Sequence, residues 1–234
     1  MPVTQNVERV RQQIADAARR FSRDPKEITL MAVSKTFAAD SIRQAYQAGI
    51  RVFGENRVQE FSGKAETLAG MEEAEWHMIG HLQSNKAAKA AELFAAIDSV
   101  DSVRLAERLN SSAALLGKKL AVLIEINVGG EAAKSGLTSE SPELDKLLHA
   151  ASRLEHLDFR GLMTVPPFTE DPQLARPYFR QLRELRQEIS ARKLPRLIMD
   201  VLSMGMSHDF EVAIEEGSTC VRVGTAIFGE RTKL

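Results

Sequence analysis

Segments with helical periodicity alternate with short apolar runs along the whole chain, and this alternation constrains the fold more than any other feature. The first segment, Thr4 to Phe21, carries apolar residues at steps of three and four, which is the stripe of an amphipathic helix. Asp24-Pro25 breaks that helix, and Ile28 to Lys35 is then an apolar run of strand length. The same order of helix and strand repeats to the end of the chain.

The pattern predicts eight strands, each preceded by a helix. The expected strands are Ile28–Lys35, Arg51–Phe53, Glu75–Gly80, Ala95–Val100, Leu120–Asn127, Leu157–Val165, Leu197–Ser203 and Thr219–Ile227. The expected helices are Thr4–Phe21, Ser41–Ala48, Arg57–Leu68, Asn85–Phe94, Val103–Leu116, Pro142–Leu154, Gln173–Arg192 and Phe210–Glu216. Strands that alternate with helices pair in parallel through right-handed crossovers.

Eight such units in 234 residues suit a closed barrel of the α/β class. We therefore expect a single (β/α)8 TIM-type barrel with an extra N-terminal helix, and one domain over residues 1–234. The rival fold is a doubly wound open sheet. That fold usually carries a glycine-rich turn after its first strand, where this chain has Val33-Ser34-Lys35-Thr36 instead.

Composition narrows the classes of function. Lys plus Arg number 31 and Asp plus Glu 32, a balance that argues against nucleic-acid binding. The single cysteine, Cys220, excludes an intramolecular disulfide. No signal-peptide pattern opens the chain and no window holds the ~20 apolar residues of a membrane span, so we expect a cytoplasmic protein. His77 and His81 would lie about 13 Å apart on a strand, too far to share a metal ion.

A lysine stands where the chemistry of a barrel is expected, at the carboxyl end of the first strand. If Lys35 points into the barrel mouth, partial burial would lower the pKa of its ammonium. A lysine in that state forms a Schiff base with an aldehyde. The alternative is a solvated lysine just beyond the strand.

The last strand carries a second cation, Arg222. Closure of the barrel makes the first and last strands neighbours, so we expect Lys35 and Arg222 to lie side by side. Two adjacent cations repel each other unless the lysine is neutral or an anion lies between them, and an aldehyde that carries a phosphate satisfies both conditions. The alternative is an ion pair between Arg222 and Glu125 or Asp200.

The loops after the seventh and eighth strands are the usual phosphate loops of such barrels. In this chain they span residues 203–209 and 224–229. Ser207 and Thr225 offer hydroxyl donors, and Gly224 allows the backbone to approach an anion closely. The first turn of the helix near Asp209 adds free N–H groups.

Seven ordered blocks, read together, resemble the YggS/PROSC family of pyridoxal phosphate homeostasis proteins. The blocks are Ala32–Thr36, Phe53–Asn56, Trp76–Lys86, Lys134–Gly136, Arg160–Met163, Ser203–Ser207 and Val221–Gly229. The resemblance implies a barrel like the N-terminal domain of bacterial alanine racemase, with pyridoxal 5'-phosphate bound as a Schiff base. It assigns that bond to Lys35, the phosphate to Ser207, Gly224, Thr225 and the backbone of Met206, the pyridine nitrogen to Arg222 and a place near the ring to Asn56.

Both chemical reasoning and the resemblance predict that the protein with bound pyridoxal phosphate is a weak catalyst. An arginine beside the pyridine nitrogen opposes its protonation, which makes the cofactor a poorer electron sink. Racemisation also needs acid and base groups on both faces of the substrate carbon. The tyrosines, Tyr46 and Tyr178, fall within expected helices, and within these 234 residues we expect no counterpart of the second domain of racemases.

Three functions stay open at this point. The first is a non-enzymatic protein of vitamin B6 homeostasis that holds pyridoxal phosphate and hands it to apo-enzymes. The second is a pyridoxal-phosphate-dependent racemase, and the third is a lyase that attacks a keto substrate through Lys35 without a cofactor. We expect the first, in a monomer that binds neither nucleic acid nor membrane.

Overall fold

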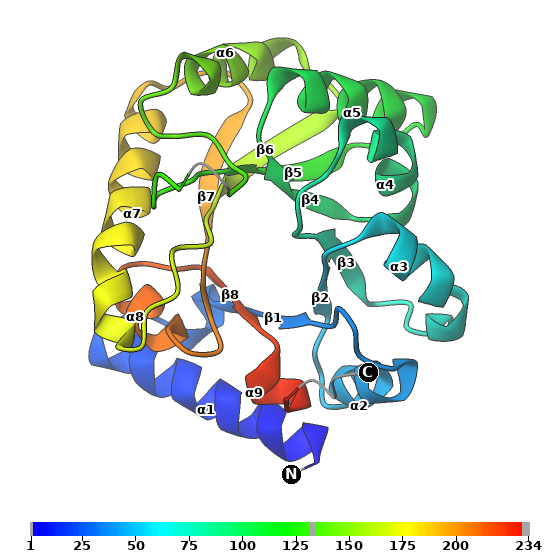
Figure 1. Ribbon diagram of the computed structural model, residues 1–234, viewed down its shortest axis with the longest axis vertical. Helices are drawn as coiled ribbons and strands as arrows, with labels where there is room; N and C mark the ends of the chain where they lie inside the picture. The colour runs from blue at the N-terminus through cyan, green and yellow to red at the C-terminus, as the bar shows by residue number, and fades with distance from the viewer. Residues whose placement is uncertain (1, 132–133, 231–234) are drawn as a thin grey trace.

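Eight parallel strands close into a barrel in the order of the chain, with β1 paired to β8 (Figure 1). The computed structural model describes residues 2–131 and 134–230. The strands are β1 Thr29–Val33, β2 Val52–Glu55, β3 Glu75–Met78, β4 Ala96–Val100, β5 Leu120–Glu125, β6 Leu157–Met163, β7 Leu197–Met206 and β8 Cys220–Val223. The predicted (β/α)8 barrel is therefore confirmed, and closure excludes the open doubly wound sheet.

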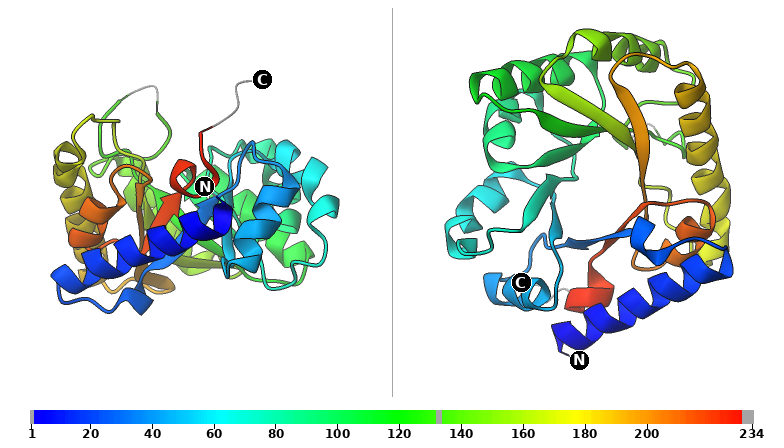
Figure 2. Two further views of the ribbon diagram at one scale, coloured as in Figure 1. Left: turned by 90° about the horizontal axis from the view of Figure 1, so that it is seen from below. Right: turned by 180° about the vertical axis from the view of Figure 1, so that it is seen from behind.

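Helices surround the barrel between successive strands (Figures 1 and 2). They are α2 Ala39–Gln47, α3 Val58–Lys64, α4 Ala87–Leu93, α5 Val103–Leu115, α6 Pro142–Ala150, α7 Arg176–Ala191 and α8 Phe210–Glu215. Several predicted helices are shorter than expected because a turn of 3₁₀ helix occupies one end, as at Ser84–Lys86 and Ala151–Arg153. Within the described residues, no helix combines the length and the apolar character that crossing a bilayer requires.

The N-terminal helix α1, Val3–Arg20, takes the place of the outer helix that would follow β8. Among the described residues, the four-residue helix α9, Thr225–Phe228, is the one helix that follows that strand, and α1 packs against α2, α8 and α9 (Figure 2). Asn6 Nδ2 donates to the carbonyl of Ile227 at 2.8 Å, and Arg9 donates to that of Ala226 at 3.0 Å. The extra helix is thus the missing eighth helix of the outer layer.

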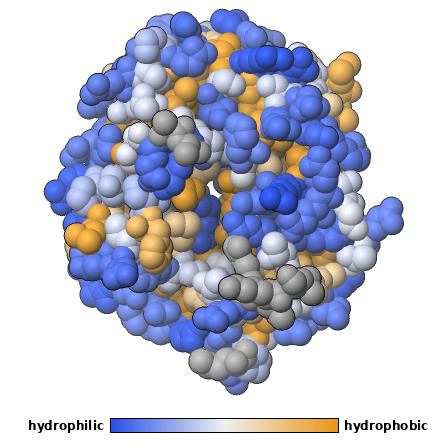
Figure 3. All heavy atoms as spheres, in the orientation of Figure 1, coloured by the Kyte–Doolittle hydropathy of each residue, from blue (hydrophilic) through white to orange (hydrophobic). Residues whose placement is uncertain are grey.

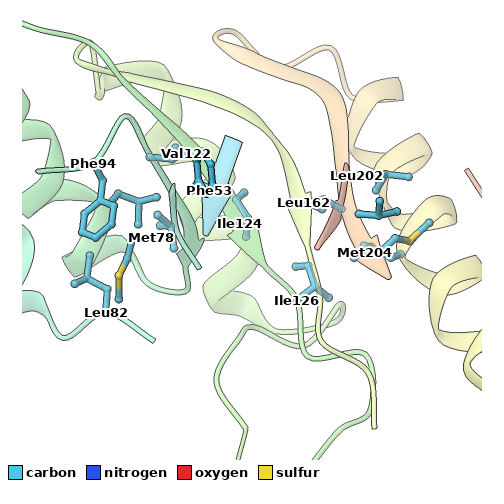
Figure 4. Packing of buried hydrophobic residues seen from close by; sticks show 14 of the residues in the cluster. Phe53, Met78, Leu82, Phe94, Val122, Ile124, Ile126, Leu162, Leu202 and Met204 are labelled. Carbon is cyan, nitrogen blue, oxygen red and sulfur yellow. The ribbon is translucent and has the colours of Figure 1, made fainter. Parts of the chain in front are cut away.

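The apolar core lies between the strands and the helices. Alternate strand residues such as Phe53, Val122, Leu162 and Leu202 are fully buried in it (Figure 4). Because side chains alternate along a strand, the intervening residues face the barrel axis. Several of those inward positions are polar, and they include Ser203 and Arg222. The contacts between strands and helices therefore provide most of the buried apolar surface, and buried polar side chains gather along the barrel axis.

Seven of the eight strands end at a different residue from the one predicted, and three of these differences affect residues of the expected site. β1 ends at Val33, so Lys35 lies in a turn and not on the strand. β7 continues to Met206, and the expected loop from Ser203 to Met206 is part of the strand. β8 ends at Val223, because the N–H groups of Phe228 and Gly229 turn back to the carbonyls of Gly224 and Thr225, both at 2.9 Å.

Candidate functional site

The carboxyl ends of the strands surround a hollow in the middle of the face shown in Figure 3. A cavity of about 300 Å³ at this mouth is lined by residues that include Asn56, His81, Glu125 and Lys134. Asn56 directly follows β2, and its backbone packs so closely on Gly80 that a Cβ there would lie 2.4 Å from the Asn56 carbonyl oxygen. Asn56 thus stands at the barrel mouth, as the sequence predicts.

The turn after β1 holds Lys35 in a half-buried position. Ser34, just before it, is fully buried, and its hydroxyl donates to Glu55 Oε1 at 2.6 Å. The N–H of Thr36, just after it, donates to Glu60 Oε1 at 2.6 Å. The side chain of Lys35 is thus partly covered, so the alternative of a fully solvated lysine is not what the structure shows.

The position of Arg222 differs from the prediction in one respect. β8 does pair with β1, but Arg222 is opposite Met31, four residues before Lys35. The expected side-by-side arrangement of Lys35 and Arg222 is therefore wrong, since the arginine lies deeper along the barrel axis.

Arg222 is buried and donates only to neutral oxygens. Its guanidinium reaches the carbonyl and hydroxyl oxygens of Ser203, both at 2.7 Å, and the carbonyl of Thr164 at 2.6 Å. Across residues 2–131 and 134–230 no carboxylate forms an ion pair with it, so the expected alternative of a pair with Glu125 or Asp200 is wrong; Asp200 pairs with Arg160. Burial lowers the pKa of Arg222, opposed by the acidic groups around it.

Hydrogen bonds to the Ser207 hydroxyl connect the two predicted phosphate loops. Its hydroxyl oxygen accepts from the backbone N–H of Gly224 at 3.1 Å and from that of Ala226 at 3.4 Å. Among the described residues, neither the hydroxyl proton of Ser207 nor that of Thr225 has an acceptor, so both are available to an anion. The Met206 N–H is engaged, because it donates to Asp209 Oδ1 at 2.6 Å.

Two buried glutamates at the carboxyl ends of β2 and β5 were not predicted as site residues. Glu55 is fully buried and Glu125 nearly so, and each has one side-chain oxygen without a hydrogen-bond partner in the part of the chain that the structure describes. Ser135 donates to the other oxygen of Glu125 at 2.9 Å. Burial raises the pKa of both carboxyl groups. The signal in the sequence was a glutamate at the end of an otherwise apolar strand.

The opposite end of the barrel holds a cavity of about 530 Å³ that includes His77, Asp98 and Cys220 in its lining. Burial raises the pKa of the Cys220 thiol to about 12, which leaves it protonated and unreactive at neutral pH. His77 pairs with Asp98 at 3.1 Å, whereas His81 pairs with Asp101 at 3.3 Å. No group of three or more His, Cys, Asp or Glu side chains that could hold a metal ion occurs within residues 2–131 and 134–230.

The His77–Asp98 pair predicts a pH-dependent stability. Burial lowers the pKa of His77, but Asp98 and Glu75 outweigh that effect and raise it from 6.5 to about 9. A raised pKa stabilises the folded protein fully below pH 6.5, and this contribution is lost as the pH rises through 9. The loss amounts to about 3 kcal/mol of unfolding free energy.

Urea unfolding at a series of pH values tests this expectation, with His77→Gln as the matched variant that cannot titrate. The wild type should lose its advantage over His77→Gln as the solution becomes alkaline. Parallel pH profiles for the two proteins would contradict the role given to the pair.

The barrel, with its lysine turn after β1 and its two hydroxyl groups after β7 and β8, belongs to the alanine racemase class of barrels by comparison with known families. The family model described as alanine racemase, N-terminal domain, matches residues 5–232. A pyridoxal phosphate homeostasis protein of Aquifex aeolicus is 44% identical over 231 residues, which are 99% of each chain. The chain belongs to this family of pyridoxal phosphate homeostasis proteins.

Solved structures agree with this assignment. A protein of unknown function from Bifidobacterium adolescentis is 38% identical, with a TM-score of 0.90 over 97% of this chain and 94% of its own. PipY of Synechococcus elongatus, solved with pyridoxal phosphate bound, is 40% identical, with a TM-score of 0.81 over 92% of this chain and all of its own.

Proposed function

We propose that this protein binds pyridoxal 5'-phosphate reversibly through a Schiff base on Lys35 and thereby controls the supply of this reactive aldehyde. The observation that carries the proposal is the order of the strands. β8 lies between β1 and β7, so the Lys35 turn, the Gly224–Thr225 turn and the Ser207 turn adjoin one another on a single seam. The bound cofactor in PipY supports the same reading.

The groups along this seam fit a phosphorylated pyridine aldehyde. The hydroxyl protons of Ser207 and Thr225, which have no acceptor among the described residues, can be donated to phosphate oxygens, which only accept hydrogen bonds. Gly224 has no side chain to keep the backbone away from a phosphate, and its N–H donates a hydrogen bond to the Ser207 hydroxyl. The Met206 N–H contributes only if Asp209 releases it. Arg222 would face the ring nitrogen and Asn56 the ring.

When bound, pyridoxal phosphate supplies an electron-withdrawing ring that acidifies bonds next to an attached amine nitrogen. In our proposal, the residues around the site keep the bound cofactor from catalysing a reaction efficiently. The charged guanidinium of Arg222 opposes a proton on the ring nitrogen. Tyr46 lies on α2 and Tyr178 on α7, so both belong to the outer layer of helices and not to the strands that line the barrel. We propose on this basis that the protein is not an enzyme.

The alternative function is a racemase that uses the same lysine, and the match to the racemase N-terminal domain favours it. Assays with several L-amino acids decide between the two. We expect the rate of the loaded protein to equal that of free pyridoxal phosphate at the same concentration. Faster interconversion by the wild type, lost in Lys35→Ala, would establish the racemase instead.

We propose further that residues 1–234 act as one cofactor-binding domain, as a monomer in the cytoplasm, and that apo-enzymes receive the cofactor. What supports this is the closed barrel and the absence of an anchoring helix among the described residues. Size-exclusion chromatography with light scattering tests the monomer, and a dimer mass would refute it.

A further inference from the structure

The turn after β7 carries a buried carboxylate two residues beyond Ser207. Asp209 Oδ1 accepts from the N–H of Met206 at 2.6 Å, and the N–H of Asp209 donates back to the carbonyl of Met206 at 3.1 Å. The side chain belongs to a residue that is 8% exposed. Because these two bonds close a ring over residues 206–209, the carboxylate of Asp209 is fixed close to Ser207.

Gly205 allows this turn to fold tightly against the end of β7. Its φ is +94°, and a Cβ there would lie 2.6 Å from the Cβ of Ala213 and 2.9 Å from the Cα of Phe210. A larger residue would push α8 away from the strand. Asp209 directly precedes α8, so the close packing at Gly205 also sets the position of its carboxylate.

The negative charge of Asp209 lies beside the turn without a bonded cation. Burial raises the pKa of Asp209. The N–H of Met206 and the charges of Arg222 and His208 oppose that rise and favour the ionised form. Arg222 directs its N–H groups to neutral oxygens, and His208 Nε2 is bonded to the carbonyl of Glu170 at 2.9 Å. Within residues 2–131 and 134–230, Asp209 therefore has no ion-pair partner.

This carboxylate acts against a phosphate at Ser207 in two ways. It occupies the Met206 N–H, one of the backbone donors that could otherwise bind a phosphate oxygen. It also adds a like charge, because a phosphate ester carries about −1.5 to −2 charges near neutral pH. Ser207 and Asp209 line the same cavity, so an anion held by the hydroxyl lies within range of that charge.

We propose that Asp209 is a residue that sets the affinity for the phosphate group, by withholding the Met206 N–H and by repelling the phosphate charge, so that the cofactor is held reversibly. This inference rests on the proposed function, because it takes Ser207 and Thr225 as the phosphate site. Asp209 acts on binding and is not a catalytic residue.

The test compares two ligands that differ only in the phosphate. The full-length wild type and Asp209→Asn are titrated with pyridoxal 5'-phosphate and with pyridoxal, and binding is followed by fluorescence. Asparagine keeps an oxygen that can accept from Met206 but has no charge. The dissociation constant of pyridoxal 5'-phosphate should fall about tenfold in the variant, the change that about 1.4 kcal/mol brings. That of pyridoxal should not change, whereas a merely structural effect would alter the binding of both ligands.

Two further variants support the comparison. Glu211→Gln removes the same charge two residues along α8, from a side chain that is 39% exposed and paired with Arg20 at 2.8 Å. It should leave both dissociation constants unchanged. Asp209→Ser takes the place of Asp209→Asn if that variant does not fold, because serine is also favoured directly before a helix. It should likewise tighten the binding of pyridoxal 5'-phosphate alone.

The outcomes separate this inference from the proposed function. A wild type that binds pyridoxal as tightly as pyridoxal 5'-phosphate overturns the proposed phosphate site and this inference with it. A wild type that prefers the phosphorylated ligand, with a neutral Asp209 variant that binds it no more tightly or tightens equally on pyridoxal, overturns the role of Asp209 alone.

Discussion

Lys35→Ala is expected to abolish the covalent attachment of pyridoxal phosphate. The wild type should keep a yellow colour through gel filtration, because the covalent Schiff base and the phosphate contacts hold the cofactor together. The variant keeps the hydroxyl donors of Ser207 and Thr225 but has no amine at that turn, so it should elute colourless. Visible absorbance of the eluted protein at equal concentration measures the effect.

The matched control for this experiment is Lys119→Ala. Lys119 lies at the opposite end of the barrel, just before β5, with its side chain 60% exposed and near Asp158. That variant should stay as yellow as the wild type. A Lys35→Ala protein that keeps full colour would show that another amine carries the cofactor.

Loss of both seam hydroxyls should have the second-largest effect. Each hydrogen bond to a charged phosphate contributes about 1.5–3 kcal/mol, so Ser207→Ala with Thr225→Ala should weaken binding by about 3–6 kcal/mol. That range corresponds to a dissociation constant about 10² to 10⁴ times larger. A fluorescence titration with pyridoxal phosphate measures it.

The control pair for the seam is Ser111→Ala with Ser112→Ala. These hydroxyls donate to the carbonyls of Glu107 and Arg108 on α5, far from the strand ends. The melting temperature of both double variants should be measured as well, because the Ser207 hydroxyl also accepts a hydrogen bond from the backbone of Gly224. Unchanged affinity in a folded Ser207/Thr225 double variant would mean that the phosphate binds elsewhere.

The barrel itself could be predicted from the sequence, because strand and helix periods alternate without interruption. The ends of the strands could not be predicted as well. Gly205 has a φ of +94°, and the pairing of β7 with β8 shifts between Ser203 and Met206. Such a shift depends on contacts between strands and leaves no periodic signal. Residues expected in a loop therefore extend β7.

The positions of the proposed site residues at the strand ends were easier to predict than the partners of those residues. Lys35, Ser207, Gly224 and Thr225 are predicted by their place at strand ends. The neutral acceptors of Arg222 come from β7 and from the residue after β6, and only the register of the closed barrel brings them together. Glu55 and Lys64, which form an ion pair, were not predicted to interact, because nine residues and a change from strand to helix separate them.

The central claim is that one amine, on the turn after β1, carries the cofactor aldehyde. Borohydride reduction of the loaded wild-type protein, followed by peptide mass mapping, tests it most directly. We predict a single major adduct of pyridoxal phosphate on the peptide that contains Lys35. An adduct spread over surface lysines, or confined to a peptide without Lys35, would contradict the account.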